Sequence, residues 1–148
     1  MSDDELLWEP VDGCWSVRKR DGKWTFEVVK PDPDPAPFTT IAWLIAHMTQ
    51  VAFVVGHAVR GEPVRGRPAT FGTATDAVVE WSACVDALAT ALDEATDEDL
   101  ARDYASSPGA EPNSVEAMVW RTIYELIHHG AEVSRMRHLY ANRLTLHA

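Results

Sequence analysis

The chain has 148 residues, of which 46% are hydrophobic and 24% charged, and its formal net charge at pH 7 is −10. This length is enough for a buried core, so we expect one domain over residues 1–148. The negative charge argues against a nucleic-acid partner, because phosphate backbones are bound through clustered lysine and arginine.

The N-terminal segment MSDDELLWEP is acidic and lacks the basic and apolar regions of a signal peptide. No apolar stretch is long enough to suggest a membrane span, so we expect a cytoplasmic protein with no membrane partner. The two cysteines, Cys14 and Cys84, have neither a metal-binding nor a redox spacing, and we expect two free thiols.

Residues 1–38 are expected to form a short β-hairpin followed by a proline-rich segment. Asp21-Gly22 is a strong signal for a two-residue hairpin turn, and apolar residues alternate with polar ones beside it. The prolines of KPDPDPAPF exclude a helix and favour an extended linker.

Helical periodicity predicts a bundle over residues 39–142. The first long helix runs from a threonine cap at Thr39 or Thr40 to near Gly61, the second from about Thr75 to Ala95, and the third from a cap at Asn113 or Ser114 to about Asn142. A short helical turn with its own cap is expected at residues 96–100. Because the connections look short, we predict an all-α, antiparallel helix bundle.

The third predicted helix carries two ionisable residues on its expected core-facing stripe. Glu125 and His129 are four residues apart, so their side chains share one helix face with Met118 and Met136. Burying a carboxylate and an imidazole there costs stability unless something pairs them, and a divalent metal would do so. His128 points about 100° away, and we expect it to flank the site or to be exposed.

A third metal ligand must come from another helix. His47 lies on the flank of the apolar stripe of the first predicted helix, where it can turn into the bundle. Two histidines and one glutamate would leave a coordination position open, as in catalytic metal sites. Glu132 shares the centre of the same stripe; we expect it to act as a catalytic proton acceptor, to orient His129 or a bound water, or to pair with Arg135 or with solvent. Without a metal, the trio would be a buried polar pair and a hydrogen-bonded core histidine.

Three sequence blocks together resemble the DinB-like (DinB/YfiT-like) metalloprotein superfamily. They are ELLWEPVDGCWSVR, PDPDPAPFTTIAWLIAHM and YELIHHGAEVSRMRHLY. The similarity is to the actinobacterial-type members that include mycothiol-dependent maleylpyruvate isomerase, whose branch has E-x-x-x-H on the last helix. The resemblance implies a DinB-like bundle in which His47, Glu125 and His129 bind a divalent metal, commonly zinc or nickel.

The resemblance also implies a long helix before the LWEP segment, and here Met1 stands where that helix would be ending. We therefore expect either a start codon further upstream or a bundle completed in another way. The residues of the third helix agree with this, because Trp120, Ile123 and Ile127 form an apolar side away from the core stripe. This apolar side would be covered by the hairpin, by a partner subunit in a homodimer, or by a helix that this chain lacks.

Two classes of function fit these features. In the first, which the resemblance implies, the protein would be a metal-dependent thiol S-transferase or isomerase: a low-molecular-weight thiol, such as mycothiol, would bind at the open metal position as cosubstrate and attack an electrophilic substrate. Metal-assisted hydrolysis is a variant of this class. In the second, a metal stabilises a bundle that serves only for binding or dimerisation. The loops at residues 62–72 and 105–112 would set substrate choice.

Overall fold

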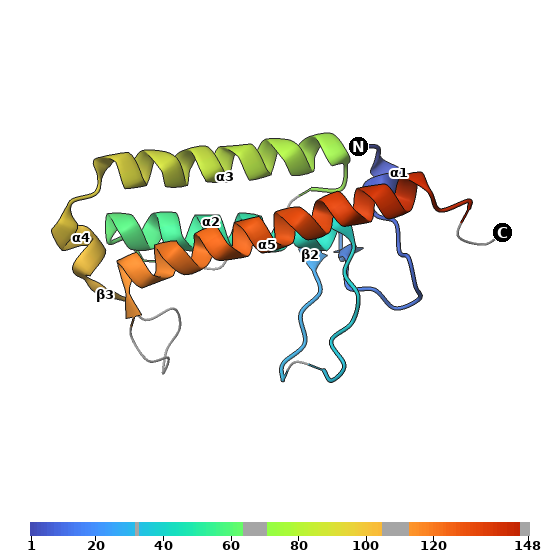
Figure 1. The fold of residues 1–148 in the computed structure, drawn as a ribbon, viewed down its shortest axis with the longest axis horizontal. Coiled ribbons are helices and arrows are strands. Elements are labelled where there is room, and N and C mark those ends of the chain that lie inside the picture. Colours follow the sequence, from blue (N-terminus) through green and yellow to red (C-terminus); the bar gives the residue numbers. More distant parts are fainter. Residues whose placement is uncertain (32, 64–70, 105–112, 146–148) are drawn as a thin grey trace.

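The computed structural model describes residues 1–31, 33–63, 71–104 and 113–145, and within them three long helices dominate the chain (Figure 1). These are α2 (Ile41–Arg60), α3 (Ala74–Glu94) and α5 (Val115–Ala141). The short elements are α1 (Asp3–Leu6), α4 (Asp97–Ala101) and the strands β1 (Val17–Arg20), β2 (Lys23–Phe26), β3 (Asp103–Tyr104) and β4 (Asn113–Ser114). The predicted helical bundle with an N-terminal hairpin is confirmed.

Each long helix begins at a hydroxyl side chain that accepts a hydrogen bond from the backbone N–H three residues later. Thr40, Thr73 and Ser114 fill this role for α2, α3 and α5, at 3.3, 3.1 and 3.2 Å. Such caps satisfy backbone donors that have no partner inside the helix, and this is why the helix starts could be predicted closely. Thr96 and Asp99 form the reciprocal capping box of α4.

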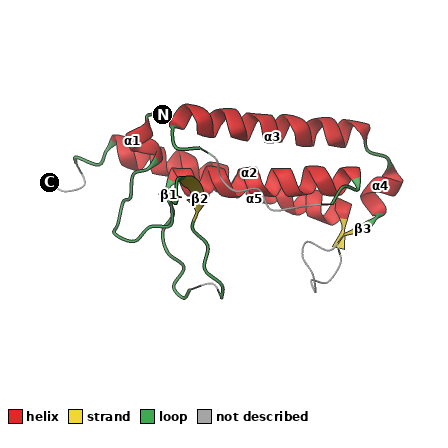
Figure 2. Ribbon diagram, turned by 180° about the vertical axis from the view of Figure 1, so that it is seen from behind, coloured by secondary structure: helices red, strands yellow, loops and turns green. Residues whose placement is uncertain are grey.

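One pair of helices departs from the predicted antiparallel arrangement. Helices α2 and α3 run in the same direction and α5 runs against both, as the sequence colours of Figure 1 show, and Figure 2 shows the same three helices from behind. The contacts agree, because Gly56 and Arg60 near the end of α2 meet Leu88 and Ala87 in the second half of α3. The connection permits this course, because residues 61–73 can span about 40 Å when extended, whereas the 20 residues of α2 cover about 30 Å.

The N-terminal hairpin forms as predicted and fixes the start of α2. Asp21 and Gly22 have φ values of 49° and 77°, as a tight two-residue hairpin turn requires, and β1 pairs antiparallel with β2. The backbone of Trp15 then exchanges hydrogen bonds with Phe38 and Thr40 at 2.8 and 2.9 Å. The hairpin is therefore held against the first turn of α2.

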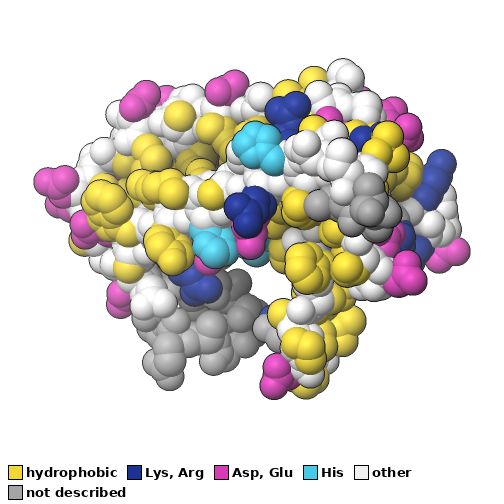
Figure 3. All heavy atoms as spheres, turned by 45° about the vertical axis from the view of Figure 1, so that its right-hand side comes forward, with side chains coloured by type: hydrophobic (Ala, Val, Ile, Leu, Met, Phe, Trp, Pro, Cys, Tyr) yellow, Lys and Arg dark blue, Asp and Glu magenta, His cyan; other side chains and the backbone are white. Residues whose placement is uncertain are grey.

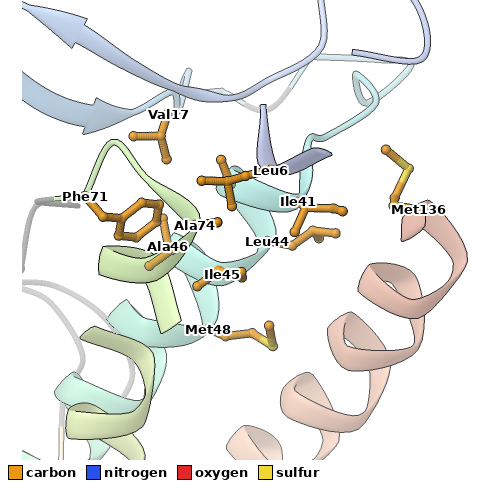
Figure 4. Packing of buried hydrophobic residues seen from close by; sticks show 12 residues of the cluster. Leu6, Val17, Ile41, Leu44, Ile45, Ala46, Met48, Phe71, Ala74 and Met136 are labelled. Atoms are coloured by element: carbon orange, nitrogen blue, oxygen red, sulfur yellow. The ribbon is translucent and has the colours of Figure 1, made fainter. Parts of the chain in front are cut away.

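The core is built along α2, which is buried on more than one side. One cluster surrounds its first half, where Leu6, Val17 and Phe71 come together over the helix and Met136 lies across from it on α5 (Figure 4). A second cluster joins its second half to α3 and to Val115 of α5. Both cysteines, Cys14 and Cys84, are buried thiols that form no disulfide with each other, as predicted.

Helix α2 also corrects the expectation that no segment is long enough to span a membrane. By length and mean hydropathy, 1.4 over 18 residues, this helix passes such a test. However, 67% of that window is buried inside the protein. A core helix of a soluble protein has the same properties, so this is weak support for a membrane span.

The second apolar side of α5 lies on the surface, as the sequence indicated. Trp120, Ile123, Tyr124 and Ile127 form what we call the α5 outer ridge, and Trp120 and Ile127 are 64% and 70% exposed. Hydrophobic side chains gather on the face seen in Figure 3, among acidic, basic and histidine side chains. The hairpin, which was one predicted cover, leaves this ridge exposed.

The short helix α1 was not predicted, and it ties the two outer helices together. The Asp3 carboxylate accepts a hydrogen bond from the backbone N–H of Ala74 at 2.7 Å, at the start of α3. Glu5 accepts one from Arg137 Nε of α5 at 2.8 Å. Burial by itself raises the pKa of Glu5, but the hydrogen bond and charge of Arg137 outweigh it and lower the pKa overall.

A Glu5→Gln substitution tests this link. Because its pKa is lowered by folding, Glu5 stabilises the protein above its unfolded pKa, and this contribution is lost as the pH falls through the folded value. Arg137 is half exposed, so we expect a loss of about 0.5–1 kcal/mol at pH 7, or about 1–4 °C in Tm. The loss should shrink toward pH 3, and Asp4→Asn in the same helix should change Tm less. Equal losses at both pH values would contradict the ionic role.

Candidate metal centre

The fold brings the three predicted ligand residues together at the interface of α2 and α5. His47 Nε2 of α2 lies 3.6 Å from Glu125 Oε2 of α5, and His129 Nε2 lies 3.1 Å from the same oxygen. One ligand atom from each residue falls within 4.8 Å of the others. Spacing of i and i+4 places Glu125 and His129 on one face of α5, and the packing of α2 on that face supplies His47.

These separations suit a divalent metal. Four ligands around zinc at about 2.0–2.1 Å stand about 3.3 Å apart when the geometry is tetrahedral. The distances from Glu125 Oε2 to the two imidazole nitrogens, 3.1 and 3.6 Å, lie on either side of that value. Two imidazole nitrogens and one carboxylate oxygen are also a donor set that suits zinc and nickel. The residues therefore fit the metal, with a fourth position left for an exogenous ligand.

The hydrogen bonding of His129 supports this interpretation. Its Nδ1 lies 2.6 Å from Glu132 Oε2, and the ring nitrogen must carry the hydrogen, because an ionised carboxylate only accepts. In the neutral ring, Nε2 then presents a lone pair to Glu125 Oε2 at 3.1 Å. Two acceptors at that distance need a proton or a bound cation between them.

His47 is held by aromatic packing against Trp43. Their rings stack with centroids 5.1 Å apart and an angle of 10° between the planes. The indole N–H of Trp43 donates to the Glu27 carbonyl at 2.7 Å, which links the hairpin to the site. Burial lowers the pKa of His47 and the nearby His129 lowers it further, although Glu125 acts in the opposite direction. The lowered pKa favours the neutral imidazole, which is the form that a metal ligand requires.

Glu132 and His128 form a second grouping beside the first. Glu132 binds His129 through one oxygen, and its other oxygen lies 3.5 Å from His128 Nε2. Among the described residues, these histidines are the ionic partners of Glu132, and a pair with Arg135 does not form. The contact favours the predicted orienting role of Glu132; its role as a proton acceptor stays a prediction. His128 was expected only to flank the site, and its approach to Glu132 was missed.

A cavity of about 490 Å³ opens beside the centre, between α2 and α5. His47 and Glu125 line one end of it, and Tyr104 of β3 and Asn113 of β4 line the other. This volume is within the range of small-molecule sites. Most of the loops expected to set substrate choice, residues 64–70 and 105–112, lie outside the described residues.

Comparison with known families agrees with this centre. A family model described as the DinB superfamily matches residues 1–133. This chain belongs to the DinB superfamily. The superfamily binds metals, and the matched part of this member contains His47, Glu125 and His129. Searches of the curated proteins and of the solved structures gave no match.

Metal content of single variants tests the centre. We expect the protein, purified without a His tag and reconstituted with zinc or nickel, to hold about one equivalent of metal and to lose thermal stability with a chelator. His47→Ala and His129→Ala should each weaken binding by more than about 100-fold, because a ligand matters more than a residue that orients it. The readouts are metal analysis and Tm with and without chelator.

His138→Ala is the matched control for these variants, since it removes an exposed histidine from the same helix as His129. It should keep the metal content and the response to chelator. A wild-type protein that retains no metal, and whose Tm a chelator leaves unchanged, would exclude the metal centre.

Proposed function

We propose that this DinB superfamily member is a metal-dependent enzyme of the thiol S-transferase or isomerase type. The observation that carries the proposal is the convergence of His47, Glu125 and His129 beside a cavity of about 490 Å³. Three protein ligands leave an open position, which distinguishes catalytic sites from closed structural ones. A zinc or nickel ion bound there would lower the pKa of an exogenous thiol and stabilise its thiolate.

The chain's own residues prepare this chemistry in three ways. His47 and His129 offer imidazole nitrogen donors, and Glu125 offers a carboxylate oxygen. Glu132 holds the hydrogen on Nδ1 of His129, so that Nε2 is directed at the centre. The apolar part of the cavity wall, including Val51 and Met118, limits water around the reacting groups.

The finer assignment to thiol chemistry rests on resemblance. The Glu125–His129 spacing matches the E-x-x-x-H branch that includes mycothiol-dependent maleylpyruvate isomerase. In the proposed step, the thiolate sulfur forms a bond to an electrophilic carbon of the substrate. The thiol proton passes to solvent. In an addition the π bond of the attacked carbon breaks and its electron pair takes up a proton from solvent, and in a transfer reaction the leaving group departs with the electron pair of its bond. Mycothiol or a related small thiol in the cytoplasm would be the cosubstrate.

The α5 outer ridge favours a second candidate function. An exposed apolar strip with Trp120 and Ile127 suits a metal-stabilised bundle whose role is binding or homodimerisation. Metal-dependent hydrolysis, with water in place of the thiol, uses the same three ligands and differs only in the exogenous ligand.

Thiol consumption by the metal-loaded protein separates these functions. We expect wild-type protein to accelerate the reaction of mycothiol with at least one electrophile in a panel, because the bound thiol is ionised at neutral pH. His129→Ala should abolish the acceleration, and His138→Ala should retain it. The measurement is the loss of free thiol over time, with ester and amide hydrolysis followed in parallel.

Glu132→Gln distinguishes the two roles of that residue. If Glu132 orients His129, metal affinity should fall by about 10–100-fold while kcat recovers at saturating metal. A proton acceptor would instead lose kcat at full metal occupancy. No thiol turnover by a wild-type protein that holds its metal would contradict the transferase assignment and leave the hydrolase and the binding module, which the parallel hydrolysis assay separates.

A further inference from the structure

The cavity beside the metal centre is an elongated trough. On α5 it extends from Glu125 to Ala117, and at ~1.5 Å per residue these positions are about 12 Å apart along the helix. Val51 and Val54 of α2 face Met118 across it. A molecule with its reactive end at the metal centre would therefore lie lengthwise between the two helices, with its body against apolar side chains.

Among the residues that the structure describes, Arg121 is the cationic side chain that lines this trough. It lies one helical turn from Glu125, and its Nε is 3.8 Å from Glu125 Oε1, which is beyond hydrogen-bond distance. The Arg121 side chain is 80% exposed. Its guanidinium group therefore keeps donors for a ligand at the rim of the trough, next to the candidate metal centre.

The charge balance at this end of the trough favours an anion. A divalent metal bound by two neutral histidines and Glu125 would keep one net positive charge, which the Glu132 carboxylate beside His129 offsets, and Arg121 then leaves this end of the trough with one net positive charge. Metal ligation by Glu125 would also weaken the only ionic contact that Arg121 makes within the described part of the chain. A guanidinium group pairs with a carboxylate through two parallel hydrogen bonds, which gives it a preferred ligand geometry.

We propose that the trough binds an elongated carboxylate, with its carboxylate group on Arg121 and its apolar body along Val51, Val54 and Met118. This inference names the substrate class of the same site and so rests on the proposed function. Arg121 is then a specificity-determining residue. It selects carboxylates over neutral molecules of the same shape, and the polar Asn113 and Tyr104 line the part of the trough away from the metal centre.

Calorimetric titration with two matched probes tests the proposal. The probes are 4-phenylbutyrate and 4-phenylbutanol, which differ in the carboxylate alone. Zinc-loaded wild-type protein should bind the acid about tenfold more tightly than the alcohol, a modest preference because Arg121 is exposed to solvent. Arg121→Gln should remove this preference. Arg135→Gln, at an exposed position on the same helix outside the trough, should retain it.

A second variant tests the apolar part of the trough. Ala117 is exposed and lines the cavity, so Ala117→Trp would fill the trough without disturbing the core. It should weaken both probes alike. Equal binding of acid and alcohol by the wild type, an unchanged preference in Arg121→Gln, or no binding of either probe would overturn the proposal.

The same titrations in metal-free protein separate this inference from the proposed function. If zinc fails to bind but an Arg121-dependent preference for the acid persists, the enzyme assignment falls and the carboxylate site stands. If zinc binds and Arg121→Gln leaves the preference unchanged, the carboxylate site falls and the metal centre stands.

Discussion

Helix α2 is buried by α3 on one side and by α5 on another, and the rest of the structure is arranged around it. Its first half packs under the hairpin, α1 and Phe71, and its second half packs on Leu88 and Val115. Because α2 is packed along both of its halves, His47 has a fixed position relative to α5. The pairing of His47 with Glu125 and His129 is therefore a consequence of core packing, and a metal would add to an interface that already exists.

The sequence predicted those features that depend on local physics. Thr40 and Ser114 are caps because of hydroxyl geometry, Asp21-Gly22 is a turn because of its positive φ values, and Glu125 with His129 converge because of helix periodicity. The sequence predicted that neighbouring helices would be antiparallel, and this was wrong for α2 and α3. The length of a connection allows either direction. Helix α1 was missed because Asp3–Leu6 is too short for periodicity, and its partners in α3 and α5 are distant in sequence.

Helix α5 presents different chemistry on its two faces. The inner face carries Glu125 and His129, and the outer ridge exposes Trp120 and Ile127 to solvent. Arg121 lies at the rim between them and lines the trough. A partner that covered the outer ridge would approach this rim, so that assembly and ligand access would be linked through one helix.

The most direct test of the metal centre is a crystal structure of the zinc-loaded protein, with anomalous data collected on both sides of the zinc absorption edge. The account predicts one strong zinc peak bound to Nε2 of His47, Nε2 of His129 and a carboxylate oxygen of Glu125, with the fourth position facing the trough. A zinc ion on His128 and Glu132 instead, or no zinc peak between α2 and α5, would contradict it.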